Sequence, residues 1–318
     1  MLHCRFLAVG VVLLAANLLA GHPAKATEPT DLNPTDWVVL DNGHLRVGLK
    51  RASGGAIGWI SASGSTRNLV NSYDRGRLIQ QSYYGRADGS LWNGQPWRWN
   101  PVQGGDWQGR STRLLDLQVE SNKAYVKTLP KHWASGEDLT EALMQQWLAL
   151  EGDCIRVRYR FEVSGGRDHP VQHQELPAVF VQPEFQTLVV YRGDQPWTDQ
   201  PLDRLRPGWP NEIHAMTEHW AAYVDQHDYG LGIYVPVANR LTCYRYGSDP
   251  KGIDACAYLA PLGEFAIKEN FQWQYEVVLS IGTSQQLRSR FYELAHPSVQ
   301  ATAGSERDPK PTAEKATP

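Results

Sequence analysis

Residues 74–108 hold the side chains best suited to chemistry, because aromatic rings alternate there with amides and charged groups. Four tryptophans, at positions 92, 97, 99 and 107, are interleaved with Asn, Gln, Arg and Gly rather than with aliphatic residues. Indole faces stack on the C–H faces of sugar rings, and amides or short carboxylates hydrogen-bond the ring hydroxyls. The segment therefore predicts a carbohydrate cleft; the alternative is that the indoles only fix a long loop onto the body. The predicted sugar contacts are Arg77, Gln80, Trp97, Trp99, Asn100, Gln103 and Trp107.

Asp106 and Glu175 are the candidate acids for glycoside hydrolysis. Two carboxyl groups that flank a glycosidic bond serve as acid and as base or nucleophile when their surroundings separate their pKa values. Asp106 follows two glycines and has tryptophans nearby; its alternative role is a turn residue that accepts bonds from backbone amides. His173 lies two residues before Glu175, so on a strand both point to one face and form a candidate catalytic pair. The alternative is an ordinary hydrogen-bonded pair at a strand start.

Elimination from a uronate is the second possible reaction, and it uses different atoms. A base removes the C5 proton of the sugar while a cation or amide neutralises the carboxylate. Tyr83 or Tyr84 with His173 would supply the first role, and Arg77 with Gln80 the second. The sequence thus supports a polysaccharide lyase as the alternative to a hydrolase.

A metal site is the third possibility, formed by His169, His173 and Glu175. Pro170 disfavours the helix that would place both histidines on one face, so no metal is expected, and no cofactor fingerprint occurs in the chain. Further polar side chains that could line the same cleft are Glu212, His214, Glu218 and His219.

Periodicity predicts an all-β protein, a large antiparallel sandwich. Residues 154–163 alternate apolar with charged side chains, as in a half-buried strand, and their three arginines form either a solvated face or an attractor for an acidic polymer. Weaker strand patterns, separated by Gly, Pro, Asn and Asp, favour a sandwich over βαβ units. They cover residues 45–49, 114–119, 124–129, 144–150, 188–191, 231–235 and 273–281. A single short C-terminal helix is expected over residues 284–294, capped by Thr283 or Ser284.

The N-terminus predicts export. A basic start, an apolar run over residues 6–20 and the small-x-small site at Ala24 and Ala26 are typical of a signal peptide over residues 1–26. One sandwich domain is then expected over residues 27–300, with a disordered tail over residues 301–318, and the destination is periplasmic or extracellular. The net charge of −3 argues against nucleic acid and anionic membrane surfaces as partners.

Three cysteines follow the predicted signal peptide. In an oxidising compartment Cys243 and Cys256 are close enough in sequence to bridge a hairpin, and Cys154 would then be unpaired. The sequence leaves open whether that disulfide forms.

The first part of the chain resembles a known group. The segments Leu40-Asp-Asn-Gly-His-Leu-Arg-Val-Gly-Leu49 and Gly54-Gly-Ala-Ile-Gly-Trp-Ile60 resemble the first hairpin of galactose-mutarotase-like proteins. Arg75-Gly-Arg-Leu-Ile-Gln80 and Asn100-Pro-Val-Gln-Gly-Gly-Asp106 are similar to segments of secreted bacterial proteins in this group. The resemblance covers residues 37–108 and implies a β-supersandwich that binds sugar on the concave face of a large sheet. The His and Glu motifs of the mutarotases are not found, so the resemblance does not imply epimerisation of a free sugar.

These observations predict a secreted carbohydrate-active protein, first of all a glycoside hydrolase. A polysaccharide lyase that uses Tyr and His, or a non-catalytic carbohydrate-binding protein, are the alternatives. The expected partner is a carbohydrate substrate or ligand.

Overall fold

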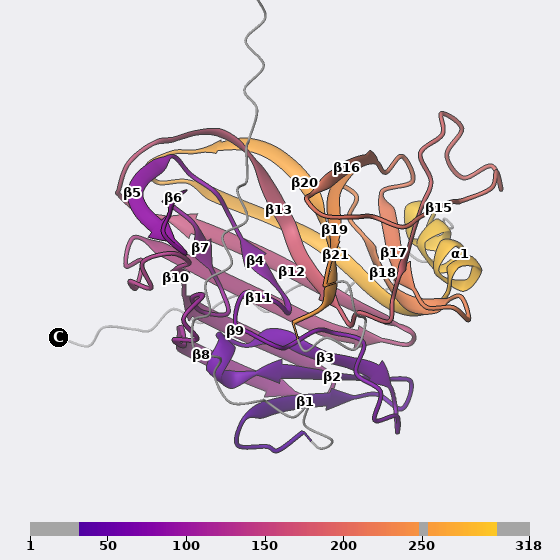
Figure 1. The fold of residues 1–318 in the computed structure, drawn as a ribbon. Helices are drawn as coiled ribbons and strands as arrows, with labels where there is room; N and C mark the ends of the chain where they lie inside the picture. The colour runs from indigo at the N-terminus through magenta and orange to yellow at the C-terminus, as the bar shows by residue number, and fades with distance from the viewer. Residues whose placement is uncertain (1–31, 248–253, 298–318) are drawn as a thin grey trace, which may run out of the picture.

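The computed structural model describes residues 32–247 and 254–297 (Figure 1). Strands dominate this part of the chain, as the sequence predicts, and one α-helix, α1 (Ser284–Ala295), follows the last strand. The predicted signal peptide and C-terminal tail lie outside the described residues. Within them, no helix combines the length and apolar character that a membrane span requires.

The first sheet has ten antiparallel strands and is called here the ten-stranded sheet. Its main path places β13 and β20, which are distant in sequence from the N-terminal strands, at the centre beside β4. The path runs β1 (Trp37–Asp41), β2 (Leu45–Lys50), β3 (Ala56–Ala62), β4 (Ile79–Ser82), β13 (His169–Val181), β20 (Cys256–Ile267), β19 (Arg240–Tyr246) and β16 (Glu212–Ala215), with β7 (Pro101–Val102) beside β4 and β10 (Lys131–His132) beside β7.

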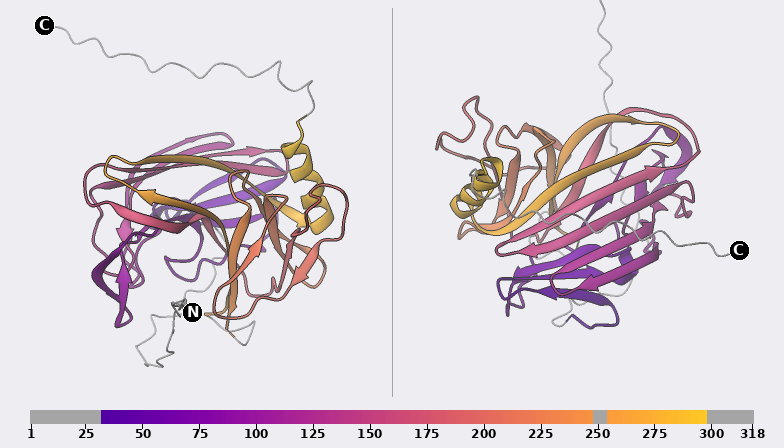
Figure 2. Two further views of the ribbon diagram at one scale, coloured as in Figure 1. Left: turned by 90° about the horizontal axis from the view of Figure 1, so that it is seen from above. Right: turned by 180° about the vertical axis from the view of Figure 1, so that it is seen from behind.

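The second sheet has nine antiparallel strands and packs against the first (Figure 2). A two-stranded hairpin stands apart from both and consists of β5 (Ala87–Trp92) and β6 (Gln95–Arg98), while a short 3-10 turn, η1 (Arg51–Ser53), joins β2 to β3. The nine-stranded sheet runs β15 (Asp203–Leu205), β14 (Thr187–Val190), β17 (Trp220–Val224), β18 (Tyr229–Tyr234), β21 (Gln272–Thr283), β12 (Cys154–Val163), β11 (Ala142–Glu151), β9 (Lys123–Leu129) and β8 (Arg113–Glu120).

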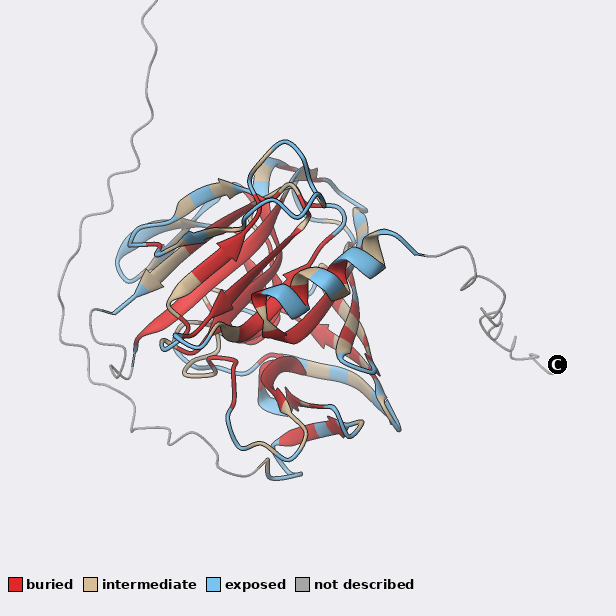
Figure 3. Ribbon diagram, turned by 90° about the vertical axis from the view of Figure 1, so that its right-hand side faces the viewer, coloured by how far each residue is buried: buried red, intermediate tan, exposed pale blue. Residues whose placement is uncertain are grey.

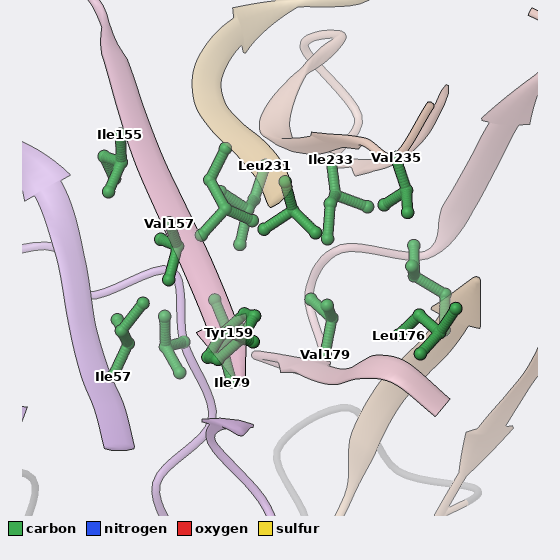
Figure 4. Packing of buried hydrophobic residues seen from close by; sticks show 14 of the residues in the cluster. Ile57, Ile79, Ile155, Val157, Tyr159, Leu176, Val179, Leu231, Ile233 and Val235 are labelled. Carbon is green, nitrogen blue, oxygen red and sulfur yellow. The ribbon is translucent and has the colours of Figure 1, made fainter. Parts of the chain in front are cut away.

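The hydrophobic core lies between the two sheets, and β12 shows how the sequence builds it. Ile155 and Val157 of β12 are fully buried and belong to the same cluster as Ile57 and Ile79 of the ten-stranded sheet (Figure 4). The alternate residues of β12 face outward, where Arg156 forms ion pairs with acidic neighbours on adjoining strands. The arginine row is therefore a solvated, ion-paired strand face on the far side of the molecule from the ten-stranded sheet.

Helix α1 covers part of the outer face of the nine-stranded sheet (Figure 3). It begins with the capping box that Thr283 and Gln286 form, which satisfies amide groups left unpaired at a helix start. Leu287 and Phe291 lie on one side of the helix and pack against the buried Trp220. The predicted C-terminal helix and its cap are thus confirmed.

The three described cysteines are free, so the disulfide alternative is wrong. Strand register explains the result, because Cys243 of β19 pairs with Leu259, and Cys256 of β20 pairs with Tyr246. Cys243 points into the core between the sheets, whereas Cys256 belongs to a cluster on the opposite face. The two thiols therefore lie on neighbouring strands but on opposite faces of the sheet, where they cannot bond to each other.

Candidate functional site

A pocket of about 240 Å³ opens on the outer face of the ten-stranded sheet. Alternate residues of a strand point to opposite faces of its sheet. Val179 of β13 and Leu259 of β20 point into the core, whereas their neighbours Phe180 and Tyr258 belong to a second cluster on the outer face. The pocket lies on that outer side, between the centre of the sheet and the β5–β6 hairpin. Its lining comprises Tyr84, Trp97, Arg98, His173, Glu175, Asn211, Ile213, Thr242, Tyr258 and Leu262.

Glu175 is the central polar group of the pocket. It lies in the middle of β13, paired on one side with Leu262 of β20 and on the other with Ser82 of β4, and only 8% of its surface is exposed. The Tyr84 hydroxyl donates to its Oε1 at 3.0 Å, and the Tyr258 hydroxyl donates to the same oxygen. Burial raises the pKa of the Glu175 carboxyl above its ordinary value of 4.5, and the hydroxyl donors only oppose that shift. A raised pKa favours the protonated acid, which is a proton donor.

The backbone of Tyr84 is held in place by a buried amide of the neighbouring strand. The side chain of Gln174 accepts from the Tyr84 N–H at 2.7 Å and donates to the Tyr84 carbonyl at 2.9 Å. Because Gln174 adjoins Glu175 on β13, this pair of bonds fixes the tyrosine hydroxyl relative to the carboxyl. The arrangement is pre-organised rather than dependent on a flexible loop.

His173 lies two residues before Glu175 on β13, and the two side chains line the same pocket, as their spacing predicts. His173 is exposed, and within the described parts of the chain its imidazole has no hydrogen-bond partner. An imidazole that is accessible and unengaged beside a buried acid can accept a proton from a bound molecule.

The β5–β6 hairpin supplies lining residues on the side of the pocket next to Tyr84. Its two-residue turn, Asn93 and Gly94, has positive φ at both positions, the backbone that Asn-Gly adopts in a tight hairpin. Trp97 packs edge-on against Trp92 with ring centroids 4.7 Å apart, and its Nε1 donates to the Oδ1 of Asn100 at 3.2 Å. The half-buried Trp97 indole thereby lines the pocket in a fixed position.

Arg98 is the cationic group of the pocket. Its guanidinium lies over the rings of Tyr84 and Trp97, 5.6 Å from each centroid. Among the described residues, Arg98 has no carboxylate partner and no hydrogen bond. Its five donors are consequently available to a ligand.

Two of the predicted aromatic residues point into the core instead of the pocket. Tyr83 is fully buried and stacks on Phe161 with centroids 4.2 Å apart, and its hydroxyl donates to Gln81. Trp99 is 6% exposed and stacks on His169 at 4.1 Å. The structure therefore places Tyr83 and Trp99 behind the sheet surface, where they fill the core.

The predicted amide and arginine contacts shape the backbone around the site. Gln80 donates to the carbonyls of Arg75 and Arg77 and accepts from the Gly104 amide. The remaining three are engaged in the same way: Asn100 donates to the Tyr83 carbonyl, Gln103 to the Gly54 carbonyl and Arg77 to the Ala255 carbonyl. None of the four lines the pocket among its described residues.

Asp106 and Trp107 lie outside the pocket, in the loop that leads to β8. The side chain of Asp106 is buried, accepts from the Gln108 and Arg110 amides and pairs with the Arg110 guanidinium. Trp107 donates from Nε1 to the Ala134 carbonyl at 2.9 Å, which fixes the loop. This geometry matches the turn alternative stated above for Asp106.

We expect Asp106→Asn to lower stability without changing sugar binding. The substitution removes the charge that faces Arg110. Breaking a fully buried ion pair costs about 3–5 kcal/mol of unfolding free energy. Because Arg110 is half-exposed and water screens its charge, the loss here should be at or below the lower of these values. Thermal unfolding and calorimetric titration with sugar, measured on the same preparation, check the two halves. Loss of sugar binding in a variant that unfolds at the wild-type temperature would return Asp106 to the catalytic candidates.

The other acidic and histidine candidates are separated from one another. A register shift between His169 and Gln172 turns His169 away from His173, and the described residues contain no group of three metal-ligating side chains. His214 bonds Glu212 at 3.1 Å, His219 bonds the Ala238 carbonyl, and Glu218 is buried beneath α1. These four do not line the pocket.

Sequence reasoning missed the part of the pocket that β16, β19 and β20 supply. Asn211 immediately precedes β16, while Thr242 lies on β19 and Tyr258 on β20, and only long-range pairing brings the three beside Glu175. The one local signal is the apolar run over residues 255–260, which indicates a buried strand but not its neighbours.

Solved structures of other proteins share the fold of this chain. No protein-family model matches the chain, and no curated protein matches its sequence. A solved galactose mutarotase-like protein from Lactobacillus casei ATCC 334 is 11% identical with a TM-score of 0.51, over 77% of this chain and 100% of that one. A galactose mutarotase related enzyme from Lactobacillus acidophilus is 9% identical with a TM-score of 0.51, over 78% and 98%. The chain therefore has the galactose-mutarotase-like β-sandwich fold.

Proposed function

We propose that the protein binds a carbohydrate in the outer-face pocket and that Glu175 donates a proton to the bound sugar. The observation that carries the proposal is a buried carboxyl of raised pKa that opens into a pocket lined by an indole, an imidazole, an amide and a guanidinium. These are the groups that stack on sugar rings and bond their hydroxyls. The mutarotase-like proteins that share the fold support a sugar ligand.

The chemistry begins at the anomeric carbon. Protonated Glu175 gives its proton to the acetal oxygen, the C–O bond breaks with its electron pair passing to that oxygen, and the cation that remains takes up water. His173 accepts the proton that the water loses. Glu175 is the one carboxylic acid among the described lining residues, so His173 takes the place of the second carboxylate expected for a hydrolase. The same pair can also catalyse ring opening of a free sugar: Glu175 protonates the ring oxygen, His173 accepts the proton of the anomeric hydroxyl, and the bond between C1 and the ring oxygen breaks to give the open-chain aldehyde.

Elimination from a uronate is the second candidate, and Arg98 favours it. A cation without an acidic partner in the described chain is suited to the carboxylate of an acidic sugar. Burial raises the pKa of Tyr84 well above 10, which makes that phenol a poor base, so His173 would remove the C5 proton. The bond between C4 and the glycosidic oxygen would break to leave a C4–C5 double bond, and Glu175 would protonate the departing oxygen. The N-terminal sequence supports action outside the cytoplasm for either reaction.

The test is a panel of neutral and uronate glycans incubated with the full chain. New reducing ends indicate hydrolysis, ultraviolet absorbance of a new double bond indicates elimination, and faster exchange between anomers of a free sugar indicates ring opening. Binding of the same panel is measured by calorimetry. If no sugar binds or reacts, the proposal is wrong.

We expect Trp97→Ala to weaken binding of any sugar that the panel identifies by up to about tenfold, the loss of one aromatic stacking contact. Leu91→Ala is the matched control, because Leu91 is exposed on the same hairpin but does not line the pocket. Equal losses in both variants would show that the hairpin, rather than the indole face, is responsible.

A further inference from the structure

An exposed indole, that of Trp209, lies in the segment just before β16 and contacts β19. Trp209 is 53% exposed, and its ring meets Tyr244 edge-on with centroids 4.8 Å apart and Tyr246 at 5.4 Å. In the described part of the chain, its Nε1 donates to no acceptor. Trp209 is not itself a lining residue, but it lies beside the pocket, because the Tyr244 ring that it contacts packs on the lining residue Tyr258 and because Asn211, two residues later, also lines the pocket.

Trp209 continues a row of aromatic rings that ends at Glu175. Tyr244 of β19 pairs with Tyr258 of β20, their rings are 4.6 Å apart, and Tyr258 donates to the Glu175 carboxyl. Strands lie about 4.8 Å apart, so β19 is roughly 10 Å from β13 across the sheet. That distance is longer than a single pyranose ring.

The small cluster beneath this row is complete without the indole. Phe180, Tyr258 and Ala260 are buried on the outer face, and Tyr244 packs against them. Trp209 does not fill a gap in this cluster, since more than half of its surface is exposed to solvent. A held but accessible indole is the usual means of stacking on a sugar ring.

Polar groups that suit a sugar lie between Trp209 and Glu175. The Asn211 amide donates to the Thr242 hydroxyl at 3.0 Å, which orients that amide and leaves its side-chain oxygen without a hydrogen-bond donor among the described residues. Trp97 and Arg98 line the pocket on the β4 side of Glu175, where the Arg98 guanidinium lies over the Tyr84 ring. Aromatic surfaces therefore flank the proton donor on both sides.

We propose that Trp209 forms a second sugar-binding subsite, and that the ligand is an oligosaccharide of at least two rings that spans Glu175. One ring lies against Trp97, and the next lies on Trp209, with Asn211 and Thr242 bonding hydroxyls between them. The inference rests on the proposed function and adds the length of the ligand. A linkage that crosses Glu175 places the bond between the two rings beside the proton donor.

The experiment compares ligand length in the full chain. Calorimetric titrations use glucose, galactose, mannose, xylose and galacturonate, and the corresponding linear disaccharides and tetrasaccharides with α- and β-linkages. The expected result is an affinity about tenfold higher for one oligosaccharide than for its monosaccharide, as one added stacking contact gives. Trp209→Ala should remove that gain and leave monosaccharide affinity unchanged, and Trp209→Phe should keep part of it.

Tyr292→Ala is the matched control, an exposed aromatic residue on α1 at the outer face of the other sheet. This variant should keep the higher affinity for the oligosaccharide. If sugars bind but affinity does not rise with ligand length, or if Trp209→Ala keeps that rise, the subsite is wrong and the proposed function still stands. If the wild-type chain binds no sugar at all, the proposed function fails and the subsite fails with it.

Discussion

Glu175→Gln is expected to reduce turnover by about 10²- to 10⁴-fold, the contribution of a positioned acid or base. Glutamine keeps the shape of the side chain and can still accept from the Tyr84 and Tyr258 hydroxyls, but it has no acidic proton to give. Sugar affinity should change far less than turnover, because the stacking and hydroxyl contacts remain. In the wild-type protein, activity should fall as pH rises through the raised pKa of Glu175, since only the protonated acid donates.

The same substitution should stabilise the protein at neutral pH. Below pH 4.5 Glu175 is protonated in the folded and unfolded chains alike, so its burial carries no charge penalty. As pH rises above that value, the unfolded chain ionises first, because burial raises the folded-state pKa, and the free energy of unfolding falls until the folded-state pKa is passed. Glutamine removes this loss, so the melting temperature of the variant should exceed that of wild type at pH 7 and match it near pH 4.

Assays of turnover and thermal unfolding across this pH range check both halves. Glu276→Gln is the control, because Glu276 is an exposed, ion-paired carboxylate on the outer face of the other sheet. It should leave turnover and its pH profile unchanged. A Glu175→Gln variant that keeps wild-type turnover, or that melts lower than wild type at pH 7, would exclude Glu175 as a buried proton donor.

Glu218→Ala should produce the largest loss of stability. The Glu218 side chain is fully buried and accepts from the Arg288 guanidinium at 2.5 and 3.0 Å, from Trp220 Nε1 at 2.9 Å and from the Trp197 amide at 2.8 Å. Removal of one partner of a buried ion pair costs about 3–5 kcal/mol, because the remaining charge has no counter-ion. The melting temperature should fall by about 10 °C for a chain of this size.

Thermal unfolding measures the effect, and Glu293→Ala is the control, since Glu293 is an exposed acid of the same helix. That control should change the melting temperature little. Because Arg288 lies on α1, the Glu218 variant should also loosen the helix, which hydrogen exchange of its amides reports. Equal stability of Glu218→Ala and wild type would show that the ion pair contributes nothing net.

The sequence by itself determined the elements whose signals are local. The alternation over residues 154–163 predicts β12 with the observed bounds, and the cap and apolar face over residues 284–294 predict α1. Spacing alone put His173 and Glu175 on one face of a strand, and composition indicated aromatic surface near them. Each of these properties depends on neighbours along the chain, where side-chain period is fixed by backbone geometry.

Only the tertiary structure decided which rings and acids reach the pocket. Trp97 lines it while Trp99 and Tyr83 face the core, and Asp106 is engaged by Arg110, although all four come from one sequence segment. The lining residues on β20, β19 and β16 reach the pocket because these strands follow β13 in that order across the sheet, through pairings between segments tens of residues apart. Alternation shows that a strand has two faces, but which face meets the core, and which strand lies alongside, is set by the packing of the whole sheet.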